Sequence, residues 1–141
     1  MSFSSNTKSE LARIMPKGDC CKLAELAALI RMSGSLQLVG NKKINLKIST
    51  ESASTARKTF KYIKDLFQIN TEVRIRKNIR LKKNNYYIML ITHFMGASLV
   101  LKKIGIFSNY DNSFNISYGI PKNILSNECC KRAYIRGAFL G

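Results

Sequence analysis

The sequence predicts a mixed α+β domain in which helices alternate with pairs of antiparallel strands. Apolar and polar residues alternate through 35–39 and 43–49, on either side of a turn at Gly40, a pattern typical of a β-hairpin. Over 51–67 the apolar residues instead recur at helical spacing. A motif also occurs twice, as Cys20-Cys21-Lys22-Leu23-Ala24 and as Cys129-Cys130-Lys131-Arg132-Ala133. The copies lie about 110 residues apart, so the duplicated unit is a half-domain rather than a solenoid repeat.

The remaining elements complete this pattern. A short helix is expected over 4–15, before Pro16. The next helix covers 20–33, with Asp19 as its N-cap and Gly34 at its end. After the helix at 51–67 the sequence predicts a second hairpin around 73–76 and 86–91, a helix over 94–103, a loop over 105–121, and a last helix over 127–140 that is capped by Ser126.

These elements divide the chain into four parts. Residues 1–19 form an N-terminal helix and loop, and 20–104 form one complete repeat of the order α-ββ-α-ββ-α. The stretch 105–125 is rich in Asn, Ser and Gly, which is typical of a linker. Residues 126–141 are expected to be the first helix of a truncated second repeat. Its small residues predict a close helix–helix contact with 20–34.

The charge balance points to nucleic acid as the partner. The 141 residues include 24 Lys and Arg against 8 acids, which gives a net charge of +16. Such an excess favours nucleic acid first and an anionic membrane surface second. There is no apolar run of membrane-spanning length and no signal-peptide pattern, so we expect a cytoplasmic protein with no membrane partner.

Cofactor and metal chemistry are not expected. The sequence contains no glycine-rich phosphate loop or dinucleotide fingerprint. The four cysteines form two adjacent pairs without metal-site spacing, so apolar packing where the repeats meet is the expected role. His93 is the only histidine and lacks partners for a catalytic triad, so it is interpreted as a structural or exposed residue.

The helix at 20–34 carries the first family resemblance. Residues Leu26-Ala27-Ala28-Leu29-Ile30-Arg31-Met32-Ser33-Gly34 resemble the LAGLIDADG signature of homing endonucleases, whose half-domain has the same α-ββ-α-ββ-α order. In those nucleases an acid in the eighth place of the motif holds the divalent metal. Here that place is Ser33, and Arg31 stands two residues earlier. A neutral hydroxyl is a poor Mg²⁺ ligand, so Ser33 marks a lost catalytic acid and the protein is not expected to be an enzyme.

A second and more specific resemblance covers essentially the whole chain. The opening Ser2-Phe3-Ser4-Ser5, the helix start Leu11-Ala12-Arg13-Ile14 and the stretch Lys82-Lys83-Asn84-Asn85 are similar to the WhiA family of bacterial regulators. This resemblance implies the N-terminal part of a longer protein whose C-terminal helix-turn-helix domain is absent here. It also implies a transcriptional regulator with a role in cell division, chromosome segregation or sporulation.

The strands carry the candidate DNA-binding residues. Successive side chains of a strand point to opposite faces, so the polar positions should line one surface and the apolar ones the core. The expected core set is Leu36, Leu38, Ile44, Leu46, Ile48, Val73 and Ile75. The candidate DNA-binding set is Gln37, Lys43, Asn45, Lys47, Arg74, Arg76, Arg80, Lys82 and Lys83. Arg57, Lys58, Lys61 and Lys64 are interpreted as the solvent face of their helix.

Duplex DNA, bound non-covalently in the nucleoid, is therefore the expected partner. Lys and Arg would neutralise phosphates, while amides and Arg could read base edges. Three alternatives stay open: a protein-interaction module of a regulator whose missing helix-turn-helix domain binds DNA, an active homing endonuclease, and a ribosomal-type RNA-binding protein suggested by charge alone. A homodimer through helices 20–34 and 127–140 is also expected, because the second repeat is incomplete.

Overall fold

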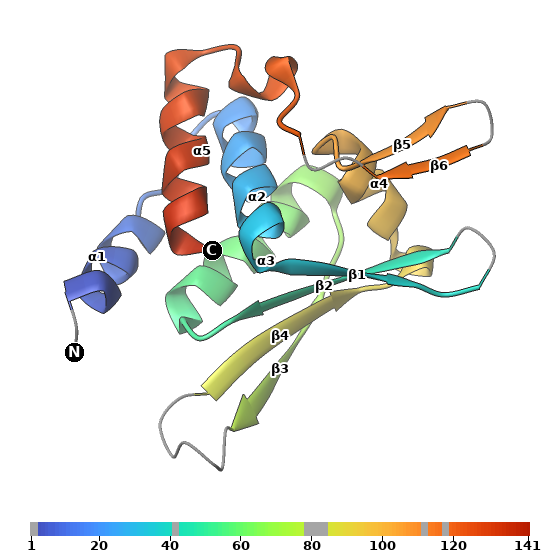
Figure 1. The fold of residues 1–141 in the computed structure, drawn as a ribbon. Coiled ribbons are helices and arrows are strands. Elements are labelled where there is room, and N and C mark those ends of the chain that lie inside the picture. The colour runs from blue at the N-terminus through green and yellow to red at the C-terminus, as the bar shows by residue number, and fades with distance from the viewer. Residues whose placement is uncertain (1–2, 41–42, 78–84, 111–112, 117–118) are drawn as a thin grey trace.

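The structure, a computed structural model, describes residues 3–40, 43–77, 85–110, 113–116 and 119–141. It has the predicted α+β class (Figure 1). The helices are α1 (Phe3–Ala12), α2 (Asp19–Ser33), α3 (Ala53–Phe67), α4 (Ala97–Lys103) and α5 (Glu128–Leu140), with short 3-10 helices η1 (His93–Met95) and η2 (Lys122–Leu125). The strands are β1 (Gly34–Leu38), β2 (Ile44–Thr50), β3 (Glu72–Lys77), β4 (Asn85–Ile91), β5 (Phe107–Tyr110) and β6 (Ser113–Ile116).

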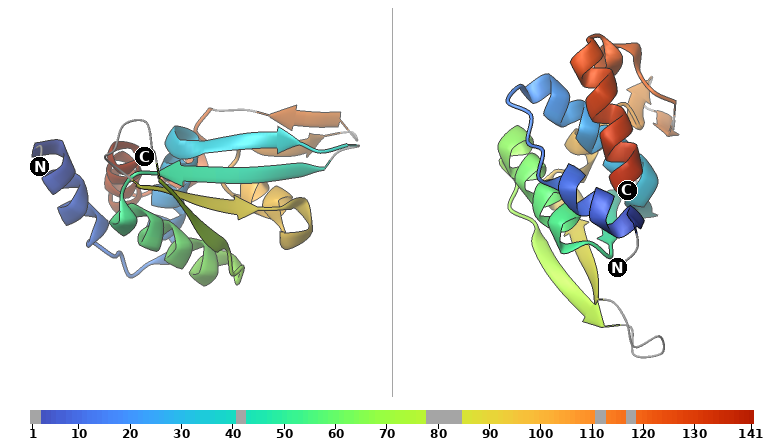
Figure 2. Two further views of the ribbon diagram at one scale, coloured as in Figure 1. Left: turned by 90° about the horizontal axis from the view of Figure 1, so that it is seen from below. Right: turned by 90° about the vertical axis from the view of Figure 1, so that its left-hand side faces the viewer.

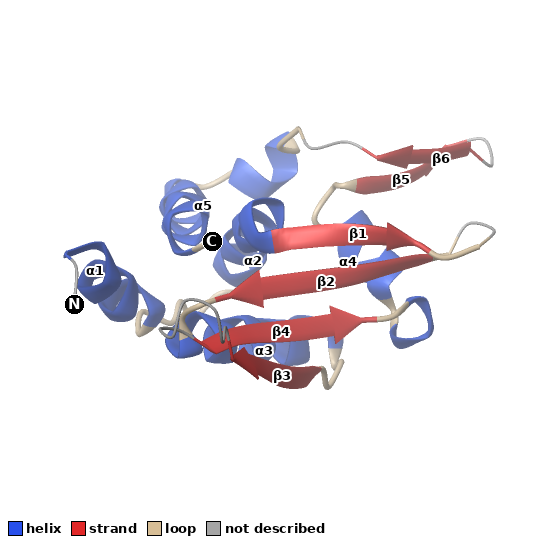
Figure 3. Ribbon diagram, turned by 60° about the horizontal axis from the view of Figure 1, so that its bottom comes forward, coloured by secondary structure: helices blue, strands red, loops and turns tan. Residues whose placement is uncertain are grey.

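Both predicted hairpin regions join one antiparallel sheet in the order β1-β2-β4-β3. The helices α2, α3 and α4 all contact β2, and they cover one face of the sheet. Figure 3 looks onto the other face, with the strands in front of these helices. The fold therefore has two layers, with the core between the sheet and the helices and with one sheet face left open.

The core face follows from the alternation. Ile44, Leu46 and Ile48 of β2 are buried beneath the helices, as are Met89 and Ile91 of the neighbouring β4. Opposite residues confirm the register, because Leu46 pairs with Ile91 and Ile48 pairs with Met89.

Three apolar residues expected in the core are exposed instead. Leu38 is 65% exposed and Ile75 is 60% exposed, and Val73 is also exposed. Leu38 is the last residue of β1, whereas Val73 and Ile75 belong to β3 at the edge of the sheet. Alternation predicted their face correctly, but the helix layer packs on the central strands and leaves these positions uncovered.

The prediction of a loop over 105–121 was wrong in part, because this stretch contains the β5–β6 hairpin. In the second strand, Ser113-Phe114-Asn115-Ile116, polar and apolar residues alternate, and this alternation is a better guide to the structure than the composition. The 94–103 helix is likewise divided at Gly96, whose φ is +113°.

The predicted caps also differ. Asp19 is the first residue of α2, whose N-cap is Gly18, and α5 is capped by Asn127 rather than by Ser126, which instead ends η2. Thus an acid lies in the first turn of α2, where it favours the helix without serving as its cap.

The helices α2 and α5 pack side by side, as the small residues predicted, and they run in the same direction (Figure 1). Ala24, Ala28 and Ala133 are fully or almost fully buried in this contact region. Gly137 of α5 lies against the backbone of Glu25, and a Cβ there would overlap the Glu25 carbonyl oxygen and lie 3.0 Å from the Ala28 Cβ. Glycine is therefore required at 137 for the two backbones to approach.

The helix α1 lies against both α3 and α5 (Figure 2).

A buried carboxylate joins the three central helices. Glu25 of α2 is completely buried, and its Oε1 lies 2.5 Å from the Lys58 Nζ of α3 and accepts from the Arg136 Nε of α5 at 3.0 Å. The hydroxyl of Tyr62 donates to the Glu25 Oε2 at 2.5 Å. Burial, followed by this hydrogen bond, raises the pKa of Tyr62 above its usual range, so the phenol stays protonated and donating.

Lys58 was wrongly interpreted as a solvent-facing residue, since it is only 3% exposed. Besides Glu25, its ammonium donates to the carbonyl oxygens of Leu11 at 3.0 Å and Ile14 at 2.6 Å. Burial lowers the pKa of Lys58, while the bond to Glu25 acts in the opposite direction. Lys58 therefore ties α1 to the α2–α3 interface.

Replacing Gly137 with Ala should destabilise the fold. Alanine favours helix formation by about 1 kcal/mol relative to glycine, but its Cβ would force α2 and α5 apart. We expect a net loss of about 1–3 kcal/mol in the free energy of unfolding, measured by urea denaturation. Gly18→Ala is the matched control, because a Cβ there meets only the Cys20 Sγ at 3.7 Å. Equal stability of the two variants would contradict the close approach at Gly137.

Lys58→Met should be much more destabilising than Lys61→Met on the same helix. The first change leaves Glu25 short of one cation and two main-chain carbonyls without their donor. Breaking a buried pair in this way costs about 3–5 kcal/mol. The Lys61 side chain is 59% exposed, and its pair with Asp65 should contribute less than about 1 kcal/mol. Chemical denaturation compares the two, and similar losses of stability would show that Lys58 acts as a surface residue.

Candidate nucleic-acid interface

The open face of the sheet carries the predicted polar residues in register. Ser35 lies opposite Lys47, and Gln37 lies opposite Asn45, in the β1–β2 pair. Across the sheet Lys47 pairs with Leu90, while in β3 Arg74 lies opposite Ile88 and Arg76 opposite Tyr86. Directly opposite residues share a face, so these side chains form one surface, which we call the open face.

The described candidates differ in exposure. Gln37, Lys43, Arg74 and Arg76 are exposed, whereas Asn45 and Lys47 are half-buried. Arg80, Lys82 and Lys83 lie outside the described residues. The acid on this face, Glu72, lies 3.9 Å from Arg74, and both side chains are largely exposed. Such a solvated pair is weak, so Arg74 keeps a charge that is available to a phosphate.

Two of the candidates also have structural partners. The Asn45 Oδ1 accepts a hydrogen bond from the backbone N–H of His93 at 2.9 Å, which fixes the start of η1 against β2. The Lys43 Nζ lies 5.0 Å from the centre of the Phe94 ring. One lone pair of the Asn45 Oδ1 is therefore occupied, while its amide N–H groups can still donate to a base edge.

Phe94 is a further candidate for the interface that was not predicted from the sequence. Its side chain is 86% exposed, beside Lys43 at one end of the open face. An exposed ring next to a cation can stack on an unpaired base or pack on a sugar. Its place beside the single histidine was visible in the sequence, but the predicted continuous helix over 94–103 offered no reason to single it out.

The centre of the open face is less polar than expected. Ile88 and Leu90 of β4 are half-buried and lie on the same surface as Lys47 and Arg74. The strand 86–91 is almost entirely apolar, so its alternation could not show which residues face outward. The basic residues thus flank an apolar strip.

A cleft of about 780 Å³ adjoins this face where α2 and α5 end. It is lined by Lys8, Ser9, Met32, Ser33, Ser49, Thr50, Glu51, Ser52, Ala53, Ser54, Tyr86, Leu140 and Gly141. Ser33, which takes the place of the metal-binding acid in the motif resemblance, is one of the lining residues. Glu51 is the single carboxylate among these lining residues, and its hydrogen bond with Tyr86 raises the pKa of that phenol. A serine-lined cleft with one carboxylate is a weak donor set for Mg²⁺.

Arg31 has a structural role in the described part of the chain. Its guanidinium donates to the carbonyl oxygens of Ala27 at 3.1 Å, Ile104 at 2.9 Å and Gly119 at 3.0 Å. These bonds fasten the end of α2 to the end of α4 and to the segment before η2. In the sequence Arg31 is notable only for its place two residues before Ser33, and that place does not predict these bonds.

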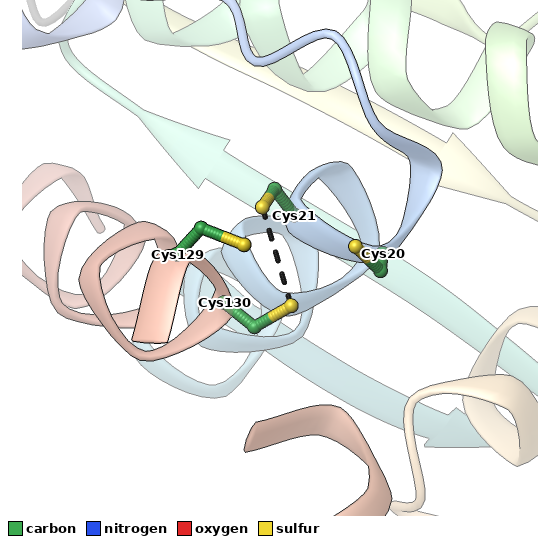
Figure 4. Close-up of side chains that lie close together, drawn as sticks. All are labelled: Cys20, Cys21, Cys129 and Cys130. Atoms are coloured by element: carbon green, nitrogen blue, oxygen red, sulfur yellow. Dashed lines mark hydrogen bonds between the residues drawn. The ribbon is translucent and has the colours of Figure 1, made fainter. Parts of the chain in front are cut away.

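The structure also brings the four cysteines together, which their spacing did not suggest. Cys20 and Cys21 begin α2, Cys129 and Cys130 begin α5, and the parallel packing of the two helices joins the pairs (Figure 4). The signal was present in the sequence as the duplicated Cys-Cys-Lys motif. The four cysteines form a cluster only because the two equivalent helices pack side by side in register.

The sequence matches the family described as the WhiA N-terminal LAGLIDADG-like domain over residues 19–107. The chain belongs to the WhiA family. It is 60% identical to a probable cell division protein WhiA of Alkaliphilus metalliredigens and 50% identical to one of Heliobacterium modesticaldum. Each match covers the whole of this chain, but only 44% and 43% of those relatives. The chain therefore spans less than half the length of the WhiA proteins it matches.

A solved structure supports the fold. The crystal structure of full-length DUF199/WhiA from Thermatoga maritima matches the whole chain with a TM-score of 0.56 and 16% sequence identity, over 39% of that protein. At this identity the match concerns the WhiA fold alone. Among the described residues, there is no helix with both the length and the apolar character needed to cross a membrane.

Proposed function

We propose that this chain is the non-catalytic DNA-binding part of a WhiA-type regulator of cell division, chromosome segregation or sporulation. The observation that carries the proposal is the open face, where Lys47, Arg74 and Arg76 lie on one surface in strand register. A two-layer fold leaves this face free of helices (Figure 3). Membership of the WhiA family and relatives named as cell division proteins support the regulatory part.

The proposed mechanism is non-covalent. Arg74 and Arg76 project from the edge strand β3, where they can reach phosphates without displacing other elements. Gln37, with an exposed side chain opposite Asn45, can present its amide to a base edge. The apolar Ile88 and Leu90 between them would pack on sugar or thymine methyl groups. Binding to the nucleoid would place the protein in the cytoplasm.

The proposal includes the loss of nuclease activity. Ser33 lines the cleft at the end of α2, and Glu51 is the single acid among the lining residues. Two carboxylates are the usual means of holding a hydrated Mg²⁺ ion beside a phosphate. The side chains of this cleft therefore favour a role in binding over one in cleavage.

A protein-interaction module is the second candidate, and one observation favours it. Val73 and Ile75 leave apolar surface exposed on the helix side of β3, at the edge of the sheet. Exposed apolar edges of this kind mark protein contacts. The homodimer expected through α2 and α5 also remains a proposal. Ile135 and Phe139 of α5 are exposed, which provides apolar surface for it.

Removing four cations from the open face should weaken duplex binding strongly. The variant replaces Lys43, Lys47, Arg74 and Arg76 with Gln, and its control replaces Arg57, Lys61, Lys64 and Lys103, which lie on α3 and α4. Both variants carry the same net charge. Only the first should flatten the dependence of log K on log salt, by about 0.9 for each phosphate that the protein no longer neutralises. Fluorescence anisotropy measures the affinity and its salt dependence for both variants. Equal weakening of binding would show that only net charge matters, and it would favour the interaction module.

Plasmid DNA should stay intact with this chain in Mg²⁺ or Mn²⁺. The reason is the replacement of a metal-binding acid by Ser33 in a cleft with one carboxylate. Gel electrophoresis after prolonged incubation provides the measurement, with a longer WhiA homologue tested in parallel. Metal-dependent cleavage that disappears in Ser33→Ala would overturn the non-catalytic assignment.

A further inference from the structure

The four thiols form one compact group. The sulfur atoms of Cys20, Cys21, Cys129 and Cys130 all lie within 4.8 Å of one another. The Cys21 and Cys130 sulfurs are 4.0 Å apart, and both residues are buried, whereas Cys20 and Cys129 are exposed (Figure 4). These are the only four cysteines in the chain. A general need for small apolar packing does not explain why all of them meet at one point.

The spacing fits a single tetrahedral ion. With zinc–sulfur bonds of about 2.3 Å, neighbouring sulfurs of a tetrahedron lie about 3.8 Å apart. The observed separations are close to this and need only small rotamer changes. A disulfide would require sulfurs about 2.05 Å apart, and an iron–sulfur cluster, with several irons inside the ligand set, would require them farther apart.

The surroundings favour thiolates. Each pair lies in the first turn of a helix, where the first intrahelical bonds are donated by Lys22 to Gly18 and by Lys131 to Asn127. The amide N–H groups ahead of these are free of intrahelical partners and can donate to sulfur.

We propose that Cys20, Cys21, Cys129 and Cys130 bind one structural zinc ion as a Cys₄ site that joins the N-terminal ends of α2 and α5. On binding, four thiols lose four protons and the Zn²⁺(S⁻)₄ unit carries a net charge of −2. All four ligand positions come from the protein, so the site is structural rather than catalytic. Because the ligand pairs are separated by 109 residues, the ion would close most of the chain into one loop.

Metal analysis of the purified chain tests the proposal. Protein produced in bacteria and kept reduced without chelators should contain about one zinc ion per chain. Replacing zinc with Co²⁺ should give the intense visible and thiolate charge-transfer bands of tetrahedral sulfur coordination. Chelation should lower the melting temperature, and stoichiometric Zn²⁺ should restore it.

The controls separate coordination from folding. Cys20→Ser with Cys129→Ser changes only exposed residues, so the fold should persist while the tetrahedral cobalt spectrum is lost. Lys131→Gln, an exposed neighbour without a thiol, should keep the spectrum. The proposal is overturned if the reduced protein has four free thiols, contains no zinc and gives no thiolate–cobalt bands. Cobalt bands that persist in the double serine variant, or a Cys21–Cys130 disulfide in freshly prepared reduced protein, would overturn it equally.

Discussion

The arrangement of the helix layer depends on a single buried carboxylate. Glu25 has no solvent exposure, and it is balanced by Lys58 and Tyr62 from α3 and by Arg136 from α5. An unpaired charge in this position would be prohibitively costly, so α2, α3 and α5 must all be in place together. The network fixes the orientation of the helices more than it adds stability. Since α2 continues directly into β1, it also fixes the sheet.

The sheet and helices divide the molecule into a supporting side and the open face of the sheet. On the supporting side small residues bring α2 and α5 into contact, and Arg31 fastens the end of α2 to main-chain carbonyls. The other side is the open face, with its basic margins and apolar centre, which we propose as the DNA-binding surface. A rigid helix layer holds the strand side chains at fixed spacing, and such a surface would suit a regular duplex better than a loop would.

Periodicity predicted the main sheet, both of its hairpins and the α2–α5 contact, because these depend on local patterns and on a visible duplication. It failed where burial depends on more distant partners. Lys58 and Lys61 lie on the same helix, and the sequence around them does not distinguish the two. Lys58 differs through its contacts with the carbonyls of Leu11 and Ile14 and with the carboxylate of Glu25. Leu38 and Ile75 have the correct alternation, yet no pattern shows how far a helix layer extends. The cysteine pairs were expected where the repeats meet, but the close group of four thiols was not predicted, because its members come together across 109 residues.

The parallel direction of α2 and α5 has an electrostatic consequence. Two helices that run side by side in the same sense add their macrodipoles, and this repulsion has to be offset within the structure. The positive ends of both dipoles lie at the two Cys-Cys pairs, where they would favour the thiolates of the proposed zinc site. The negative ends lie together beside Ser33 and Gly141. In the proposed DNA complex, the phosphate backbone would therefore be turned away from these helix ends, and the duplex would be oriented along the strands.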